Sequence, residues 1–356
     1  MSDHGFFLGQ TLNDVEILAF KGEGAFSFVY EACHIPSDIH VAVKVLKPNA
    51  NFEQIREFDN EGQLLVKLSG ANHVVNILDS QTADLQVVLA GIGTPMTVTA
   101  RFHVLELATN CLNQLVAHLD IIPWLERLRL YRNVVLGVHQ MHVASIVHRD
   151  LKTSNCLLFE KRMRQVVAKV NDLGRSRDLA QTAGAQPHHY QFGRGDPDFA
   201  PPEMLWQLGI DEPNSHRQAD LYGLGSVLYE LTTGQGITAV ALFPRVPTIQ
   251  ADLVLPERER RHQYRGRLDE IRSWFESAHT LAIPAIPLPI RNQTLGLLRQ
   301  LCDPDPMMRL PHVASWKKVL RVTDLNWLLN RVDILIKTLS NAEDQAERLA
   351  RKKASE

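Results

Sequence analysis

The sequence has few of the features that mark membrane, secreted or nucleic-acid-binding proteins. No uninterrupted apolar run approaches the roughly eighteen residues of a membrane span. The N-terminal residues lack the basic and apolar regions of a signal peptide. The net charge of −2 gives no indication of binding to nucleic acid or to an anionic membrane. We therefore expect a protein without a membrane span and without a nucleic-acid partner.

Cysteine is also scarce. The four cysteines stand singly, without the paired spacing of a zinc site or a disulfide framework: Cys33, Cys111, Cys156 and Cys302. We expect buried or incidental thiols in a reducing compartment, which predicts a cytoplasmic location. The remaining composition, 45% hydrophobic and 22% charged, is that of an ordinary globular protein. A chain of 356 residues exceeds a typical single domain and suits an enzyme of two lobes with a large core.

The most informative stretch is 148–155, which reads His-Arg-Asp-Leu-Lys-Thr-Ser-Asn. Asp150 is placed to receive a hydroxyl proton, Asn155 can ligate a metal, and Lys152 between them can neutralise a phosphoryl group. The stretch resembles the catalytic loop of the eukaryotic-like (Hanks-type) protein serine/threonine kinase family. In that family His148 is a packing residue, and Asp220 braces the backbone of the loop.

A glycine-rich stretch precedes the catalytic loop, as it does in the family. Gly22 and Gly24 lie between two strand-like segments, 15–18 and 29–32. Glycine lets bare backbone N–H groups approach phosphate oxygens, because it has no Cβ. Ser27 stands where the family usually has its third glycine. The stretch alone would also fit an ordinary hairpin turn.

The next strand-like segment ends in Lys44, which resembles the phosphate-binding lysine of the family. The spacing becomes helical over 52–68, and the resemblance implies that a carboxylate of this helix pairs with Lys44. We expect that carboxylate to be Glu61, because the residues around it resemble the family's usual run. Glu57, one helical turn earlier, is the alternative.

Further family motifs follow the loop in order. Asp172, together with Asn155, would hold the Mg²⁺ (or Mn²⁺) that bridges the phosphates of ATP. Gly174 is expected to let the backbone turn sharply behind Asp172. Leu173 replaces the phenylalanine of most kinases and is expected to pack under the 52–68 helix.

Two charged residues far apart in the sequence complete the set. In the family, Glu203 and Arg309 form a buried ion pair. Because a buried charge without a partner is costly, the presence of both residues is more informative than either one.

The resemblance implies an α+β, two-lobed protein-kinase-like fold with a small antiparallel-sheet N-lobe containing one helix and a larger helical C-lobe. We expect the N-lobe over 14–108, the C-lobe over 109–320 with an enlarged region at 235–290, and a C-terminal helical tail over 321–356. An amphipathic helix is predicted over 124–142, one charged helix over 257–275, and an extended surface strap over 283–289. The tail is expected to cover the C-lobe, with self-association as the alternative.

The adenine pocket is expected where the last N-lobe strand, 102–107, enters a hinge that binds adenine through backbone groups. By the resemblance, Leu105 is the gatekeeper, and Glu106 and Ala108 border the pocket. Three apolar side chains would sandwich the ring: Val29, Ala42 and Leu157. Each of these would also make an ordinary core residue.

The implied activity is transfer of the γ-phosphate of ATP to serine or threonine hydroxyls of protein substrates, including autophosphorylation in trans. Lys44, Glu61, Asp150 and Lys152 would be the catalytic residues. Asp196 departs from the family, which usually has a threonine there. It is expected either to pair with Lys152 or to repel Asp150.

The activation segment offers three hydroxyl acceptors for phosphorylation, Ser176, Thr182 and Tyr190, of which Thr182 is preferred. The alternative is that Asp196 or another carboxylate supplies a permanent negative charge.

Two other functions stay open. A pseudokinase or scaffold that binds nucleotide without turnover is suggested by Ser27, Leu173 and Asp196. A kinase-like small-molecule phosphotransferase would share the Asp–Asn loop and the metal-binding Asp, but generally lacks the Ala-Pro-Pro-Glu segment at 200–203 and its Arg partner.

Overall fold

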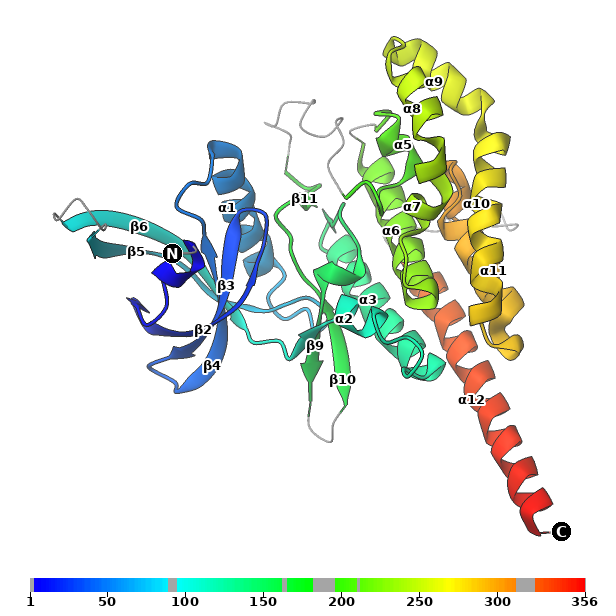
Figure 1. Ribbon diagram of the computed structural model, residues 1–356, viewed down its shortest axis with the longest axis horizontal. Helices are drawn as coiled ribbons and strands as arrows, with labels where there is room; N and C mark the ends of the chain where they lie inside the picture. Colours follow the sequence, from blue (N-terminus) through cyan, green and yellow to red (C-terminus); the bar gives the residue numbers. More distant parts are fainter. Residues whose placement is uncertain are drawn as a thin grey trace.

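The computed structural model describes residues 3–88, 95–161, 165–181, 196–209, 212–311 and 324–355. These residues form a strand-rich N-terminal part and a larger helical C-terminal part (Figure 1). This confirms the mixed α+β fold expected from the sequence. The boundaries expected for the two lobes and the tail stay predictions. None of the helices in the described ranges has an apolar stretch long enough to cross a lipid bilayer.

A six-stranded antiparallel sheet dominates the N-terminal part, in the order β1-β2-β3-β4-β6-β5. Its strands are β1 (Thr11–Leu12), β2 (Val15–Glu23), β3 (Ser27–His34), β4 (Ile39–Leu46), β5 (Ile77–Val88) and β6 (Pro95–Glu106). β-branched and aromatic residues fill its inner face, and Ile17, Tyr30 and Val43 are almost completely buried there. The β2–β3 hairpin carries the glycine-rich stretch, so the sheet positions one side of the expected site.

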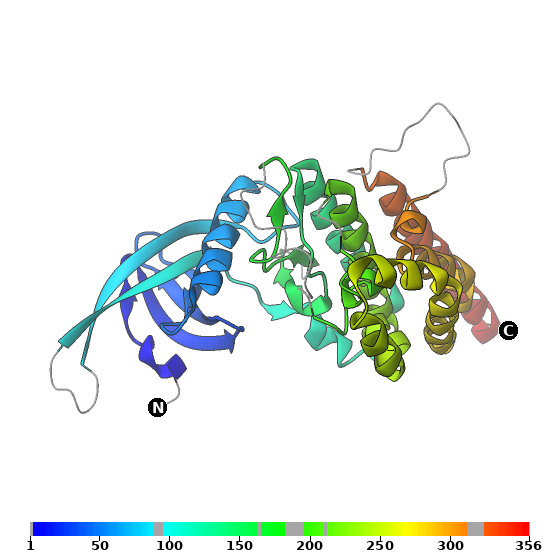
Figure 2. The same ribbon diagram turned by 90° about the horizontal axis from the view of Figure 1, so that it is seen from above.

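The helix α1 (Phe52–Lys67) lies between this sheet and the helical part (Figure 2). It begins with a capping box: the Asn51 side chain accepts from Gln54 N at 3.0 Å, and the Gln54 side chain accepts from Asn51 N at 2.8 Å. Gly62 faces β6, where a Cβ would lie 2.6 Å from the His103 ring. Only glycine allows this approach, which keeps the neighbouring Glu61 fully buried.

Helices α3 (Trp124–Val143) and α6 (Pro213–Thr233) lie at the centre of the helical part. α3 confirms the amphipathic helix predicted over 124–142. α6 is buried along most of its length and ends at Gly234, whose φ of 81° favours glycine. The other helices are α2 (Leu112–Val116), α5 (Pro202–Leu205), α7 (Ile237–Leu242), α8 (Val246–Leu253), α9 (Glu257–Gly266), α10 (Leu268–Ala282), α11 (Arg291–Leu301) and α12 (Asn326–Ser355).

Two small antiparallel sheets flank the catalytic loop, in the orders β10-β9-β7 and β11-β8. Their strands are β7 (Asn110–Cys111), β8 (Ile146–Val147), β9 (Cys156–Glu160), β10 (Val166–Val170) and β11 (Arg177–Asp178). The loop leaves β8 and enters β9, so strand pairing fixes both of its ends.

The region 235–290 differs from expectation in two places. The charged helix predicted over 257–275 is two helices, α9 and α10, which meet at Arg267. The strap predicted over 283–289 is not extended. It contains two short 3₁₀ turns, Ile283–Ala285 and Leu288–Ile290, and each has a proline at one of its first two positions, where proline is well tolerated. Between them, Ile286 is fully buried, and this inward side chain holds the run against the core.

The first half of α12 packs on the helical part, as expected for a covering tail. Leu328, Leu335 and Leu339 are buried on one face of α12. Arg132 of α3 donates to Asp333 at 2.5 Å. The last residues of α12 are exposed, and the helix extends away from the body of the molecule (Figure 1).

Candidate active site

The catalytic loop is held from beneath by one carboxylate of α6. Asp220 accepts from His148 N at 2.8 Å and from Arg149 N at 2.7 Å. Its Oδ2 also lies 2.8 Å from His142 Nε2. Burial alone would raise the pKa of Asp220, but the hydrogen bonds from His142 and from the Arg149 amide lower it overall. The charged carboxylate therefore stabilises the loop, including the left-handed backbone of Arg149 at φ 72°.

Asp150 lies at the centre of this loop with a largely buried side chain. Asn155 Nδ2 donates to the Asp150 carbonyl at 2.7 Å, and Asp196 N donates to Asp150 Oδ1 at 3.3 Å. His148 is fully buried, with Nε2 2.9 Å from the Asn171 carbonyl, which fits the packing role expected for it. These contacts orient the Asp150 carboxylate without occupying all of its acceptor positions.

Lys152 pairs with Asp196, the residue that departs from the family pattern. Lys152 Nζ donates to Asp196 Oδ2 at 3.1 Å and lies 6.0 Å from the centre of the Phe199 ring. Of the two arrangements expected for Asp196, the structure shows the ion pair. Thr153, next to Lys152, donates its amide to Glu230 of α6 at 3.1 Å, which fixes the turn.

Lys44 joins β4 to α1 and to the segment after the loop. Its Nζ lies 2.6 Å from Glu61 Oε2 and 3.3 Å from Asp172 Oδ1. The partner in α1 is therefore Glu61 and not Glu57. Burial alone would lower the pKa of Lys44, but Asp172 and Glu61 raise it above its usual value. The charge of Lys44 in turn holds the pKa of Asp172 below its usual range.

The segment after Asp172 turns differently from the sequence expectation. The positive φ, 62°, belongs to Asp172 itself, and Gly174 lies outside the left-handed region. A Cβ on Gly174 would meet its nearest neighbour at an ordinary 3.5 Å. The prediction that Gly174 provides the sharp turn is therefore wrong. Leu173 is fully buried in the main core, as expected for its place under α1.

Arg175 is a residue that the sequence analysis missed. Its Nη1 lies 3.6 Å from Asp150 Oδ2, and its carbonyl accepts from Arg149 Nη1 at 3.3 Å. Asn60 of α1 donates to the carbonyls on either side, Gly174 at 3.2 Å and Ser176 at 3.0 Å. These hydrogen bonds fix the backbone on both sides of Arg175 and place its guanidinium beside the catalytic loop. In the sequence, the position of Arg175 directly after the 171–174 motif is the only indication of a role in the site.

The glycine-rich hairpin closes through its own backbone. Gly24 N donates to the carbonyl of Ser27 at 2.8 Å, and Ser27 is buried. Lys47, also missed by the sequence analysis, donates to the Gly24 carbonyl at 2.9 Å. Phe26 at the tip places its ring 5.9 Å from Lys44 Nζ and close to Gly174. A Cβ at Gly22 would meet nothing within 4 Å, and a Cβ at the exposed Gly24 would lie 3.2 Å from Ser27 Oγ.

The apolar residues expected around adenine belong to the main core cluster or pack against it. Ala42 of β4 pairs with Leu105 of β6, and both are buried. Val29, Leu157 and Ala108 pack against the same cluster from partly buried positions. The Glu106 side chain instead forms an ion pair with Lys169 at 2.5 Å and accepts from Asn76 N at 2.7 Å. Only the backbone of Glu106 is thus left to border the expected pocket.

Asp172 and Asn155 offer the oxygen ligands that Mg²⁺ prefers. Asn155 uses its Nδ2 on the Asp150 carbonyl, so its Oδ1 is the atom free to ligate. The Asp172 side chain is 40% exposed and open to a cation. Both residues fit a metal that takes its other ligands from phosphate and water. Within the described residues, no cluster of three or more histidine, cysteine or acidic side chains forms a separate metal site.

The distant ion pair expected from the sequence is present. Arg309 donates to both oxygens of Glu203 at 2.7 Å, and the pair is buried beside Tyr222.

Of the activation-segment hydroxyls, Ser176 is buried and donates to the His148 carbonyl at 3.3 Å. Thr182 and Tyr190 lie outside the described residues.

Comparison with known proteins agrees with this geometry. The profile of the family described as "Protein kinase domain" matches residues 16–320. A probable serine/threonine-protein kinase of Clostridium perfringens is 30% identical over 225 residues, 62% of this chain and 29% of that protein. The serine/threonine-protein kinase A-Raf of Mus musculus is 29% identical over 238 residues, 65% of this chain and 34% of A-Raf.

A third relative, the serine/threonine-protein kinase PknK of Mycobacterium bovis, is 29% identical over 213 residues, 60% of this chain and 17% of PknK. The chain thus spans about a third or less of the length of these relatives. The family profile covers most of the chain, and the residues it spans include the clustered Lys44, Asp150 and Asp172. The chain belongs to the Hanks-type protein kinase family.

Proposed function

We propose that this protein kinase transfers the γ-phosphate of ATP to serine or threonine hydroxyls of protein substrates. The observation that carries the proposal is the position of Lys44, held at 2.6 Å by Glu61 and at 3.3 Å by Asp172. A buried lysine so held is preorganised to bind phosphate oxygens, since its charge and direction are set before nucleotide arrives.

The residues have separate roles in the proposed reaction. Lys44 binds the α- and β-phosphates, while Asp172 and Asn155 would hold Mg²⁺, or Mn²⁺ in its place. That ion supplies neutralising charge to the phosphates when bound. The backbone of the glycine-rich hairpin, at Gly22, Gly24 and Ser27, covers the phosphates from above.

Asp150 orients the acceptor hydroxyl and takes its proton late in the transfer. The acceptor oxygen forms a bond to the γ-phosphorus, the bond between that phosphorus and the β–γ bridging oxygen breaks, and ADP leaves. Lys152 stabilises the charge on the moving phosphoryl group, so catalysis consists mainly of positioning and electrostatics.

The apolar side chains of Val29, Ala42, Leu105 and Leu157 would hold adenine, with backbone groups of Glu106 and Ala108 as hydrogen-bonding partners.

The assignment of serine and threonine as acceptors rests on Lys152 and on the named relatives. Autophosphorylation in trans and a cytoplasmic location belong to the same proposal. The four free cysteines support a reducing compartment.

A pseudokinase is the second candidate, and one observation favours it. Arg175 lies 3.6 Å from Asp150 Oδ2, on the carboxylate that the acceptor must approach. A small-molecule phosphotransferase is disfavoured by the buried Glu203–Arg309 pair.

The test is a transfer reaction with labelled ATP and Mg²⁺, followed by mass spectrometry of the chain and of a generic protein substrate. We expect phosphoserine or phosphothreonine on both, and none with the Asp150→Asn variant. Labelling of a mass-tagged Asp150→Asn chain by the unmodified chain would test transfer in trans. Nucleotide binding without any transfer would favour the pseudokinase, and phosphotyrosine alone would overturn the acceptor assignment.

A further inference from the structure

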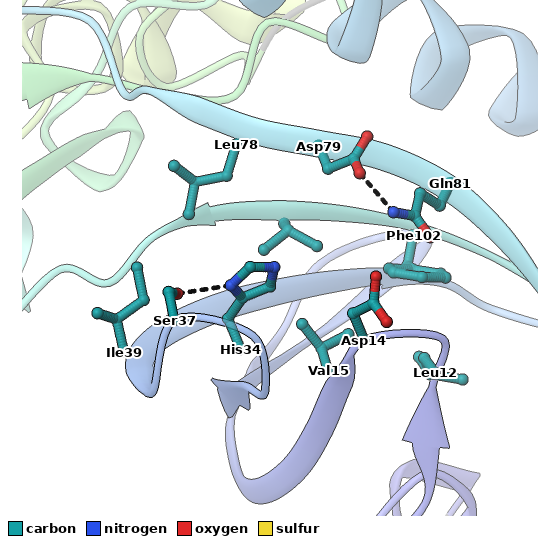
Figure 3. Close-up of a pocket in the computed structure, with 11 residues that line it drawn as sticks. Leu12, Asp14, Val15, His34, Ser37, Ile39, Leu78, Asp79, Gln81 and Phe102 are labelled. Carbon is teal, nitrogen blue, oxygen red and sulfur yellow. Dashed lines mark hydrogen bonds between the residues drawn. The ribbon is translucent and has the colours of Figure 1, made fainter.

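A separate cavity of about 320 Å³ lies in the strand-rich part, outside the candidate active site (Figure 3). Its floor is made of side chains that are almost completely buried: Leu12, Val15, Phe102 and Val104. Its rim comes from the β1–β2 turn, the β3–β4 turn and the start of β5. It shares no residue with the catalytic loop, the glycine-rich hairpin or the expected adenine surface.

The walls of this cavity are tied to one another. The Asp14 carbonyl accepts from Ile35 N at 2.8 Å, which joins the β1–β2 turn to the end of β3. Asn13 Nδ2 donates to the Thr82 carbonyl at 3.1 Å, which joins the same turn to β5. His34 Nδ1 lies 2.6 Å from Ser37 Oγ within the β3–β4 turn. Because these bonds hold three sides in place, the cavity is formed in advance of any ligand.

The charges at the rim have one sign. Asp14 and Asp79 both line the cavity, and no lysine or arginine lines it. Neither carboxylate takes part in an ion pair with another described residue. Asp79 accepts hydrogen bonds only from neutral groups, Ser80 N and the Gln81 side chain. An anion here would be repelled, and a ligand without a hydrogen-bond donor would remove water from the carboxylates without replacing it.

The carboxylates and the apolar rim lie at different ends. In Figure 3, Asp14 and Asp79 lie toward the end that Phe102 occupies, and Leu78 and Ile39 lie toward the other. Leu78 and Ile39 are 47% and 46% exposed, so each has apolar surface left to be covered. A ligand that matches this layout carries a positive charge at one end and an apolar body at the other.

We propose that this cavity binds a small organic cation, an ammonium or amidinium group on an apolar body of about one ring. The volume is near the lower end of the range for small-molecule sites, which fits a compact ligand. The cation would accept no proton and form no covalent bond. It would pair with Asp14 and Asp79 at the end that Phe102 occupies, while its body covers the rim side chains of Leu78 and Ile39. This site is independent of the function proposed for the candidate active site.

The test is direct binding of two cationic probes, benzamidine and phenethylamine, to the full chain by ligand-observed NMR and calorimetry. Their neutral counterparts, benzamide and 2-phenylethanol, are measured beside them. All titrations contain saturating ADP and Mg²⁺, so that the proposed nucleotide site does not contribute. We expect the cations to bind and the neutral compounds to bind at least about tenfold more weakly, with affinity falling as salt rises.

Variants separate this site from adventitious binding. Asp14→Asn and Asp79→Asn should each weaken binding of the cations about two- to fivefold, as for a part-exposed ion pair, and the double variant about tenfold. Leu78→Trp should block the apolar end without changing charge. Glu16→Gln is the matched control, because Glu16 is exposed, adjacent in β2 and absent from the cavity wall. Equal binding of charged and neutral probes, or unchanged binding by the double variant, would overturn the proposal.

Discussion

Lys152 Nζ lies 3.1 Å from Asp196 Oδ2, in an ion pair between the catalytic loop and the segment that leads to α5. The amide of Asp196 also reaches Asp150 Oδ1 at 3.3 Å. One residue thus contacts both the proposed base and the proposed phosphoryl-stabilising cation. A threonine at this position would donate a hydroxyl hydrogen bond, whereas Asp196 contributes a negative charge that Lys152 neutralises.

The first prediction concerns this pair. Asp196→Thr should keep or raise serine/threonine transfer, because threonine restores a hydrogen-bonding group between Asp150 and Lys152. Asp196→Lys should lower kcat by about tenfold or more, since it places a second positive charge beside Lys152. Steady-state kinetics on a protein substrate measure both effects. Asp198→Thr, two residues away on the exposed surface, is the control; transfer rates indifferent to both Asp196 substitutions would reject a catalytic role for the pair.

The second prediction separates binding from transfer. Asp150→Asn should leave the affinity for ATP nearly unchanged and lower kcat by a factor of about 10²–10⁴, because Asp150 touches the acceptor and not the nucleotide. Asp172→Asn should weaken ATP binding in the presence of Mg²⁺, since it removes the carboxylate that would hold the ion. Calorimetric titration of ATP with and without Mg²⁺ distinguishes the two. Substantial transfer by the Asp150 variant would show that the roles are wrongly assigned.

Much of the site could be predicted because its motifs keep their order along the chain. Lys44, Glu61 and Asp172 lie in separate parts of the chain, yet the spacing and the family resemblance are enough to identify all three. The Glu203–Arg309 pair was predicted from the family resemblance, and because a buried charge needs a partner, the presence of both residues strengthened that prediction.

The features that could not be predicted depend on how segments distant in the sequence pack together. The contact of Arg175 with Asp150 arises because Asn60 and Arg149 hold the backbone around it, and neither hydrogen bond leaves a trace in the local sequence. The run 283–289 was predicted as extended from its prolines alone. Its fold depends on burial of Ile286, which composition does not reveal.

The third prediction concerns Arg175. The acceptor hydroxyl must approach the Asp150 oxygen that Arg175 Nη1 contacts at 3.6 Å, so the guanidinium has to move aside. Arg175→Gln should therefore raise kcat/KM for the protein acceptor by up to about fivefold, the strength of a part-exposed ion pair. The affinity for ATP should stay unchanged. A fall in kcat instead would mean that Arg175 stabilises the transferring phosphate.

The fourth prediction follows from a buried histidine. Burial lowers the pKa of His103 to about 4, although its ring keeps a contact with the Phe58 carbonyl at 3.0 Å. The unfolded chain binds this proton near pH 6.5, so the stabilisation is present above that pH and is lost as pH falls toward 4. The free energy of unfolding should drop by about 2 kcal/mol between pH 7 and pH 5 from this group alone.

His216 and His279, whose pKa values burial lowers to about 3 and about 4, act in the same direction. Urea unfolding at several pH values measures the slope. His103→Gln should flatten the slope relative to the parent chain, whatever it does to stability at pH 7. His262→Gln, at an exposed position, should leave the slope unchanged. A parent chain equally stable at pH 7 and pH 5 would contradict the assignment.

The last prediction concerns the buried pair between Glu203 and Arg309. Glu203→Gln should lower the free energy of unfolding by about 3–5 kcal/mol, because it leaves the fully buried guanidinium of Arg309 without a counter-charge. Replacing both partners by apolar residues, as in Glu203→Leu with Arg309→Met, should lower the free energy of unfolding by less than the single change, since no charge is then left buried.

Glu347→Gln is the matched control, because Glu347 and its partner Arg351 are 69% and 83% exposed, respectively. This change should alter the free energy of unfolding by less than about 0.5 kcal/mol. Urea unfolding of the four chains measures each difference, and a double variant less stable than Glu203→Gln would show that the pair contributes more than mutual neutralisation.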